Sequence, residues 1–329
     1  MKQPIEPPHI PVSLVEQVAA IIDTHERQIT NRELLVLCEA AGVHGLSTDP
    51  HLCHEVAESA LNLLVATKYG KRLLSSTDPS TSCTGTLKPL QKRLPTQSWR
   101  SATQTTYQQF STPASIAYLA SYLLNLNGRD TVLEPSCGTG SLAVWALASG
   151  ATVFTNEIDA RRRRLAKLLG LDPTGHNAEF IDDLMPGNII PNVILANPPF
   201  SSSGGRTERN QSKFGFRHVE SALRRLANGG RFAIILGESG SPQNALGRVF
   251  WQSLRPDNCV TASIELPGHE YYRNGTTVGV TLILGRKASD GKSDPAALTE
   301  NHVNISASLV EDAFDQALAA GLRFNSTSE

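Results

Sequence analysis

The sequence predicts an α/β protein with a mostly parallel sheet, preceded by a helical domain. From residue 105 onward, short apolar runs alternate with segments of helical length and pattern, which is typical of sheets built from β-α units. Before residue 75, apolar residues recur instead at the spacing of amphipathic helices. The first apolar run of the α/β part leads into a Gly-x-Gly turn, 138–140, as found where a strand passes into a helix.

Three helices are predicted between residues 12 and 74, because each apolar stripe there follows residues that commonly cap helices. Residues 75–86 contain eight Ser or Thr among twelve residues, together with a Pro and a Gly, which favours a linker over 75–104. The residues predicted to begin the helices are Ser13 with Glu16, Thr30 with Glu33, and Asp49 with Pro50.

Seven strands are predicted in the α/β part, connected by helices such as 142–148 and 161–169. The tail 286–305 is polar, and a last capped helix is predicted from Ser308 to Ala320, ended by Gly321. The predicted organisation is a helical domain over 1–74, a linker over 75–104, an α/β domain over 105–286 and a tail with one helix over 287–329. The predicted strands are 131–133, 151–154, 178–181, 192–196, 231–236, 260–266 and 278–284.

Composition and charge exclude several classes of protein. Thirty basic and 31 acidic residues leave a net charge of −1, which excludes a polybasic mode of nucleic-acid binding but allows a local basic patch. The longest apolar run has seven residues, too few to cross a bilayer, and residues 1–11 contain no apolar signal segment. Five cysteines without a CxxC pair favour reduced thiols, so we expect a cytoplasmic protein with no membrane partner. Because His51, Cys53 and His54 have no second ligand pair, we expect no metal.

The ends of the first two predicted strands carry residues suited to a nucleotide-like ligand. In the turn around Gly138 and Gly140, backbone amides can approach a ligand closely, although such turns also serve strand–helix packing alone. No third glycine stands at dinucleotide spacing. The second strand is followed by Glu157, which could accept hydrogen bonds from both hydroxyls of a ribose or could be an ordinary surface carboxylate.

The strongest signal is Asn197-Pro198-Pro199-Phe200, directly after the predicted strand 192–196. The two prolines stiffen the backbone and lack N–H donors, which leaves a rim of acceptors, the Asn197 side-chain oxygen and the Pro198 carbonyl. Phe200 adds a flat aromatic face. This arrangement suits a planar amino group that donates two hydrogen bonds while its ring stacks. The alternative is a proline-stiffened loop with a buried Phe.

The tetrad and its surroundings resemble the S-adenosylmethionine-dependent adenine-N6 DNA methyltransferases, collinearly from about 105 to 286. In that family the tetrad is the catalytic motif, the Gly-x-Gly segment binds the methionine of the cofactor, and an acid after the second strand binds its ribose. The resemblance implies a Rossmann-like class I methyltransferase fold with a seven-stranded, mostly parallel sheet, and S-adenosylmethionine as the cofactor. It implies cofactor-binding roles for Phe110, Thr112, Pro113, Glu134, Gly138, Gly140, Glu157, Ile158 and one of Asp182 and Asp183.

The order of the motifs resembles the gamma class, because the cofactor-closing motif around Thr112 precedes the Gly-x-Gly segment. Segments 265–267 and 274–277 resemble the corresponding segments in the modification subunits of type I restriction systems. The general sequence pattern resembles that of methyltransferase modules linked to strawberry-notch-like helicases. Gamma enzymes usually carry a recognition domain after the catalytic core, but only 43 residues follow Arg286. The expected partners are therefore adenine-containing DNA and a separate specificity or helicase subunit.

The activity implied by the resemblance is transfer of a methyl group from S-adenosylmethionine to the N6 amine of adenine in DNA, with the base flipped out and stacked on Phe200. Basic residues after the tetrad would contact phosphates, or would belong to an ordinary solvated loop. Families that methylate a glutamine side chain or an RNA base share the tetrad but usually have Tyr in its fourth place, and a non-catalytic cofactor-binding subunit is a further alternative. The predicted phosphate contacts are Arg206, Arg209, Lys213 and Arg217.

Other conspicuous residues have simpler interpretations. The arginine run 161–164 is expected on a solvated helix face, and Cys137 is expected to be a small packing residue. Tyr271 and Tyr272 could contact nucleic acid, although packing of one of them in the core is equally expected.

Overall fold

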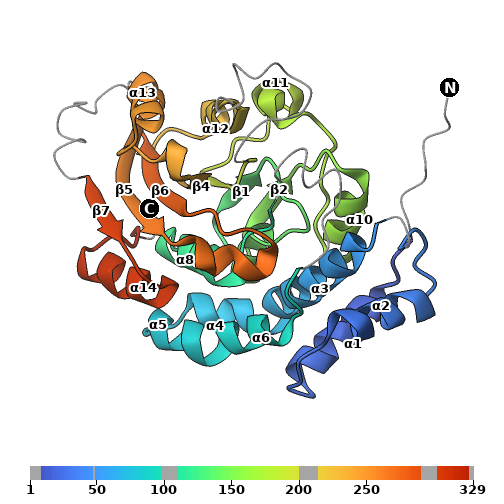
Figure 1. Cartoon of the computed structure of the whole chain (residues 1–329). Helices are drawn as coiled ribbons and strands as arrows, with labels where there is room; N and C mark the ends of the chain where they lie inside the picture. The colour runs from blue at the N-terminus through green and yellow to red at the C-terminus, as the bar shows by residue number, and fades with distance from the viewer. Residues whose placement is uncertain are drawn as a thin grey trace.

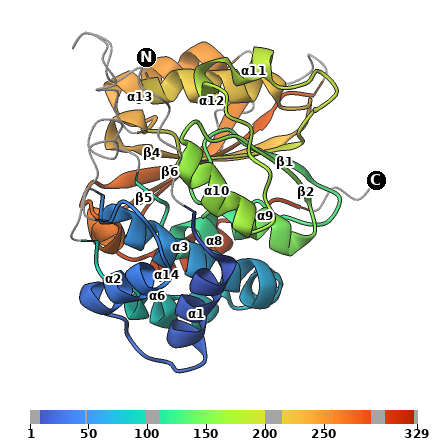
Figure 2. The same ribbon diagram turned by 90° about the vertical axis from the view of Figure 1, so that its right-hand side faces the viewer.

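A computed structural model describes residues 9–46, 49–97, 110–199, 214–255, 257–289 and 302–325. Its centre is a seven-stranded sheet covered by helices on both faces (Figure 1). The N-terminal helices lie outside one of these two helical layers, as the view turned by 90° shows (Figure 2). The predicted α/β fold with N-terminal helices is therefore confirmed.

The sheet has the order β2-β1-β3-β4-β6-β5-β7, and neighbouring strands are parallel except around β6, which is antiparallel to β4 and β5. Successive side chains of β3 serve different cores: Val193 packs in the core on one side of the sheet, and Ile194 packs in the core on the other. Both faces are apolar because both are covered. The strands are β1 (Thr131–Glu134), β2 (Thr152–Thr155), β3 (Val193–Ala196), β4 (Arg231–Gly237), β5 (Asn258–Leu266), β6 (Val280–Lys287) and β7 (Val303–Ser306).

The helices of the α/β part form two layers. One face of the sheet is covered by α11 (Ile181–Leu184), α12 (Phe214–Arg225) and α13 (Ala245–Leu254) (Figure 2). The other face is covered by α8 (Ala114–Leu123), α9 (Ala143–Ser149), α10 (Ala160–Leu168) and α14 (Val310–Ala319). Short 3₁₀ turns stand between these elements: η3 (Ala178–Phe180), η5 (Glu238–Gly240) and η6 (Gly268–Asn274). Among the described residues, no helix is long and apolar enough to cross a membrane.

One of the seven strands lies at an unexpected place. The predicted strand 178–181 is helical, because the Asn177 side chain accepts a hydrogen bond from the Glu179 N–H and so begins a helical turn. The seventh strand is β7, inside the predicted polar tail, where Ile305 is buried and Asn304 is exposed. An edge strand needs only one apolar face, so its sequence does not form a continuous apolar run.

The N-terminal part contains more helix than predicted. The linker predicted over 75–104 is wrong for the described part, because residues 79–93 are helical. Asp78 begins this segment by accepting a hydrogen bond from the Thr81 N–H, and Leu87 is fully buried. The elements are α1 (Val12–Asp23), α2 (Asn31–Ala40), α3 (His51–Leu64), η1 (Val65–Tyr69, a π-helical turn), α4 (Gly70–Leu74), α5 (Pro79–Ser82), η2 (Cys83–Leu87, also π-helical) and α6 (Lys88–Arg93).

One apolar core joins the N-terminal helices to the sheet. It extends from Ile10 to Phe324 and includes residues of α1, α3, α8, α14 and the central strands. At its centre, the Phe314 ring of α14 lies 4.8 Å from the ring centroid of Tyr118 and 5.7 Å from that of Tyr122, both on α8. The predicted division between residues 74 and 75 therefore does not separate two cores.

The starts of the first two helices offer a test of the local structure. Thr30 accepts a hydrogen bond from the Glu33 N–H at 3.2 Å, as predicted, but α1 begins after Pro11 and has no side-chain cap, so the predicted cap at Ser13 is wrong. We expect Thr30→Ala to lower the free energy of unfolding by about 1 kcal/mol. The matched variant Ser13→Ala should leave it unchanged or slightly higher, because Ala is the better residue inside a helix. Equal losses in urea titrations of the two variants would contradict these assignments.

Candidate cofactor and catalytic site

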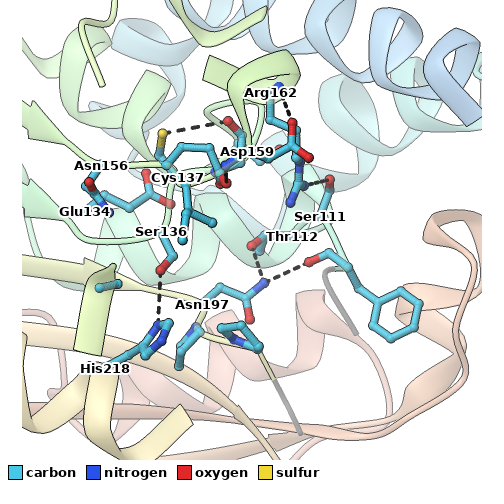
Figure 3. Close-up of a pocket in the computed structure, with 18 of the residues that line it drawn as sticks. Ser111, Thr112, Glu134, Ser136, Cys137, Asn156, Asp159, Arg162, Asn197 and His218 are labelled. Atoms are coloured by element: carbon cyan, nitrogen blue, oxygen red, sulfur yellow. Dashed lines mark hydrogen bonds between the residues drawn. The ribbon is translucent and has the colours of Figure 1, made fainter. Parts of the chain in front are cut away.

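A cavity opens at the carboxyl ends of β1, β2 and β3 (Figure 3). Strand β2 lies on one side of β1, and β3, the next strand along the chain, lies on the other. The strand order therefore reverses at β1, and such a switch point is where α/β proteins bind ligands. Its described lining residues come from the three strand ends and their loops, from the segment before α8, and from α10 and α12: Phe110, Ser111, Thr112, Glu134, Ser136, Cys137, Gly138, Ser141, Asn156, Glu157, Ile158, Asp159, Arg162, His176, Asn177, Ala178, Asn197, Pro198, Pro199 and His218.

The Gly-x-Gly turn after β1 forms one wall of the cavity. Gly138 has a φ of +57°, a backbone conformation that favours glycine, and a Cβ atom there would lie 2.7 Å from Nη2 of Arg162. Gly140 has a φ of +97° and faces Leu171 instead of the cavity. The N–H groups of both glycines have acceptors within the protein, since Gly138 donates to Glu157 Oε2 and Gly140 donates to the Cys137 carbonyl.

Glu157, which follows β2, is held by two backbone amides. Its Oε2 accepts a hydrogen bond from the Gly138 N–H and its Oε1 accepts one from the Asp159 N–H, each at 2.8 Å. The side chain lines the cavity and is only 3% exposed, so it is not a surface carboxylate. Beside it, Ile158 presents an apolar side chain that is 58% exposed.

Asn197, which follows β3, has its carboxamide fixed in one orientation. The Nδ2 amide donates to Thr112 Oγ1 at 2.8 Å and to the Phe110 carbonyl at 3.3 Å (Figure 3). The Oδ1 oxygen is buried and has no hydrogen-bond partner among the described residues. Pro198 and Pro199 continue the lining. A residue that lines the cavity thus has a fixed amide and an acceptor to which no described residue donates.

Tyr271 of η6 supports this carboxamide from behind. The residue is fully buried, which raises the pKa of its phenol, while the polar side chains of Thr112 and Asn197 beside it act in the opposite direction. Tyr272 is 60% exposed. Of the two predicted alternatives, core packing is thus correct for Tyr271.

Helix α3 forms the back of the Gly-x-Gly turn. Glu58 accepts hydrogen bonds from Ser111 Oγ at 2.6 Å and from Thr139 Oγ1 at 3.3 Å. One turn later, Asn62 donates to Ser141 Oγ at 3.3 Å. A helix far upstream in the chain thus fixes both the segment before α8 and the turn after β1.

The cavity fits S-adenosylmethionine in its polar groups as well as its place. Glu134 has a buried Oε2 with no hydrogen-bond partner among the described residues, and burial raises the pKa of this carboxyl well above its usual range. A cationic ligand beside it would favour the ionised form. Together with the two anchored oxygens of Glu157, this provides acceptors for an ammonium or sulfonium group at one end and for ribose hydroxyls at the other.

Other residues predicted for the site lie elsewhere. Pro113 precedes α8 and, like Gly140, does not line the cavity. The structure does not bring Asp182 or Asp183 to the cavity either: the helical turn at 181–184 directs Asp182 toward α12, where Ser221 Oγ donates to it at 2.6 Å. His176, Asn177 and Ala178 line the cavity in that region. Outside the described residues lie Phe200, Arg206, Arg209 and Lys213.

Several lining residues were not predicted from sequence. Arg162 was expected on a solvated face, yet it is 8% exposed and its Nη2 donates to Ser111 Oγ at 3.0 Å. His218 of α12 lies 3.3 Å from Ser136 Oγ through its Nδ1, and burial lowers its pKa to about 4. Neither residue belongs to a sequence motif of recognisable spacing, because the packing of helices against loops places them at the cavity. Cys137 is buried, as expected, and no group of three metal-binding side chains occurs in the described ranges.

Comparisons with known proteins agree with this architecture. No family model matches the chain. The type II restriction enzyme and methyltransferase RM.BcgI of Heyndrickxia coagulans is 26% identical over 151 residues, which are 39% of this chain and 23% of that protein. A putative class I S-adenosylmethionine-dependent methyltransferase from Listeria monocytogenes superposes with a TM-score of 0.55 at 14% identity, covering 95% of this chain and 96% of that one. A type I restriction-modification methyltransferase subunit from Streptococcus thermophilus gives a TM-score of 0.48 at 18% identity, covering 64% of this chain and 52% of that one.

The Listeria structure establishes the class to which the fold belongs. The chain has the Rossmann-like fold of class I S-adenosylmethionine-dependent methyltransferases, with the predicted seven-stranded, mostly parallel sheet. It spans less than a quarter of the curated relative and about half of the Streptococcus subunit.

Proposed function

We propose that the chain transfers a methyl group from S-adenosylmethionine to the N6 amine of an adenine in DNA, after the base has been flipped out of the helix. The observation that carries the proposal is the Asn197 carboxamide at the cavity, whose Nδ2 is bound to Thr112 and Phe110 while its Oδ1 has no hydrogen-bond partner among the described residues. An acceptor fixed in this way is suited to a donor that arrives with the substrate.

Methyl transfer depends mainly on the orientation of the N6 amine relative to the methyl group. The lone pair of the N6 amine is delocalised into the adenine ring, and two acceptors on its hydrogens, Asn197 Oδ1 and the Pro198 carbonyl, would make the nitrogen more nucleophilic. S-adenosylmethionine, when bound, supplies the electrophilic methyl group on a sulfonium. Holding the amine in line with that methyl group can contribute up to about 7–11 kcal/mol. Phe200 would stack on the flipped base.

On the cofactor side, Glu157 would accept the ribose hydroxyls, and Glu134 would face the positively charged methionine end. Asn177 and Ala178, which line the cavity beside Ile158, would border the adenine ring in place of Asp182 or Asp183. These proposed roles rest on the position of each residue around the cavity.

DNA is favoured over an RNA base or a protein glutamine by three features. The tetrad ends in Phe200, whereas the families that act on glutamine or RNA usually have Tyr, and basic residues follow it. The curated relative is a restriction enzyme and methyltransferase. We further propose that a separate specificity or helicase subunit selects the site on DNA.

The deciding experiment is a single-turnover assay with S-adenosylmethionine labelled in its methyl group. The chain is mixed with adenine-containing duplex DNA, single-stranded DNA, RNA or protein, and the labelled products are digested and identified. We expect label in N6-methyldeoxyadenosine. Label on cytosine, on RNA or on glutamine would replace the proposed substrate, and cofactor binding without transfer to any of them would indicate a non-catalytic subunit.

The basic loop after the tetrad gives a prediction on DNA binding. Each lost phosphate contact lowers the slope of log DNA affinity against log salt concentration by roughly 0.9. When salt rises from 50 to 200 mM, the affinity of wild type should therefore fall about 40-fold further than that of the triple variant Arg206→Ala, Arg209→Ala, Lys213→Ala. Cofactor affinity should not change. Arg217→Ala is the comparison variant: Arg217 forms an ion pair with Glu179 at 3.3 Å, so its loss should change the slope by less than about one. Fluorescence anisotropy with labelled duplex DNA measures both, and an unchanged slope in the triple variant would mean that the loop does not face phosphates.

A further inference from the structure

Arg162 occupies an unusual place for a surface-helix arginine. It extends from α10 to the end of the cavity formed by Ser111 and the Gly-x-Gly turn (Figure 3). Its Nη2 donates to Ser111 Oγ at 3.0 Å, and the same nitrogen lies against Gly138, where a Cβ atom would approach to 2.7 Å. The guanidinium is therefore seated on the turn that the sequence resemblance assigns to the methionine part of the cofactor.

The guanidinium is also the main positive charge of the cavity. Among the described lining residues, Arg162 is the only Arg or Lys, and His218, with a pKa lowered to about 4 by burial, is neutral near pH 7. Arg162 is 8% exposed, and its Nε has no hydrogen-bond partner among the described residues. The Nε forms an ion pair with Glu55 at 3.7 Å, while both terminal nitrogens lie beside Gly138 at the cavity. Terminal guanidinium nitrogens at a cavity suit a planar anion that can accept two hydrogen bonds.

The carboxylates around Arg162 already have other donors. Glu157 accepts the amides of Gly138 and Asp159, and Glu58 accepts the hydroxyls of Ser111 and Thr139. Glu55 accepts a hydrogen bond from Arg161 at 2.9 Å, while its Oε1 is 3.7 Å from Nε of Arg162, beyond hydrogen-bond distance. These groups stabilise the charge of Arg162, and Glu55 does so through an ion pair with its Nε.

We infer that Arg162 binds the α-carboxylate of the cofactor's methionine part and thereby selects cofactors that carry this group. The inference rests on the proposed function. The opposite charges at this end of the cavity match the amino-acid zwitterion: the unpaired carboxylate oxygen of Glu134 suits the ammonium, and Arg162 suits the carboxylate. Arg162 is thus a specificity-determining residue of the cofactor site.

The test compares two ligands that differ only in this group, S-adenosylmethionine and decarboxylated S-adenosylmethionine, by isothermal titration calorimetry. Wild type should prefer the carboxylated ligand by about 10–100-fold, the scale of a hydrogen-bonded ion pair. Arg162→Gln should lose this preference, because it binds S-adenosylmethionine weakly and the decarboxylated ligand nearly as well as wild type does. The matched control is Arg161→Gln: Arg161 is the next residue, forms ion pairs with Asp49 and Glu55, does not line the cavity, and should leave the preference intact.

The outcomes separate this inference from the proposed function. If Arg162→Gln keeps the wild-type preference, Arg162 does not bind the carboxylate, although the chain still binds the cofactor. If wild type binds neither ligand, the proposed cofactor is wrong and the inference falls with it. If Arg162→Gln binds neither ligand, Arg162→Lys decides, because it keeps the charge without the two-pronged geometry: a reduced or lost preference for the carboxylated ligand supports the inference, and a preference as large as that of wild type overturns it.

Discussion

Asn197→Ala is expected to slow single-turnover methyl transfer at least ~100-fold while leaving cofactor affinity close to wild type. The variant removes the Oδ1 acceptor, which has no partner among the described residues, and removes no group that would bind the cofactor. An interaction made mainly in the transition state lowers turnover and leaves ground-state binding nearly unchanged. Label transfer from S-adenosylmethionine to adenine-containing DNA measures the rate, with a partner subunit added if one is required.

Two further variants sharpen this experiment. Thr112→Val removes the stronger of the two acceptors that hold the Asn197 Nδ2, so it should lower the rate less than Asn197→Ala does, by freeing the carboxamide to rotate. Asn304→Ala, at an exposed position of the edge strand β7, is the matched control and should transfer at the wild-type rate. Wild-type transfer by Asn197→Ala would exclude the proposed mechanism.

The second large effect is expected at the cofactor. Glu157→Ala removes both oxygens proposed to bind the ribose and also leaves the N–H groups of Gly138 and Asp159 without their acceptor. We expect S-adenosylmethionine binding to weaken by about 1–3 kcal/mol, the scale of hydrogen bonds to a charged group. Calorimetry measures the affinity, and thermal melting of the free protein shows how much of the change is structural.

A matched control for Glu157→Ala is Glu39→Ala, since Glu39 is exposed on α2. The isosteric Glu157→Gln should lie between wild type and Glu157→Ala, because one carbonyl oxygen remains to accept a hydrogen bond. If Glu157→Ala binds as tightly as wild type, Glu157 does not contact the ligand.

The central strands and the loops that follow them could be predicted from the sequence. Their residues form continuous apolar runs because both faces of the sheet are covered, so the positions of Glu157 after β2 and of Asn197 after β3, on either side of β1, followed directly. Polar or glycine residues placed directly after such runs meet at one edge of a parallel sheet. The sequence therefore predicts where the cavity lies in the fold.

Other parts could not be predicted, for identifiable physical reasons. The Ser- and Thr-rich segment 75–86 resembles a linker in composition, but its side chains bond to nearby backbone groups of a helix, as Asp78 does with Thr81. Strand β7 has a single buried apolar residue, Ile305, between exposed polar ones. In both cases tertiary packing decides the outcome, and the local pattern carries little of that information.

The same limit applies to charged residues of the site. A run of four arginines indicates a solvated helix face, and only the structure shows that Arg162 faces α3 and the Gly-x-Gly turn. The direction of Asp182 likewise depends on whether its segment is a strand or a helical turn. Which way a charged side chain points is set by three or four packed elements at once.

The contacts of α3 with the Gly-x-Gly turn tie cofactor binding to the whole molecule. Glu58 and Asn62 bond to residues of that turn or of the segment before α8, and the apolar core beneath them continues to the C-terminal helix α14. A ligand that binds the folded turn is thus expected to stabilise the helices packed on both sides of it as well. Unfolding is consequently expected to be cooperative across the chain, and a fragment beginning at the sheet would lose the scaffold of its own ligand pocket. The N-terminal helices are therefore expected to unfold together with the sheet.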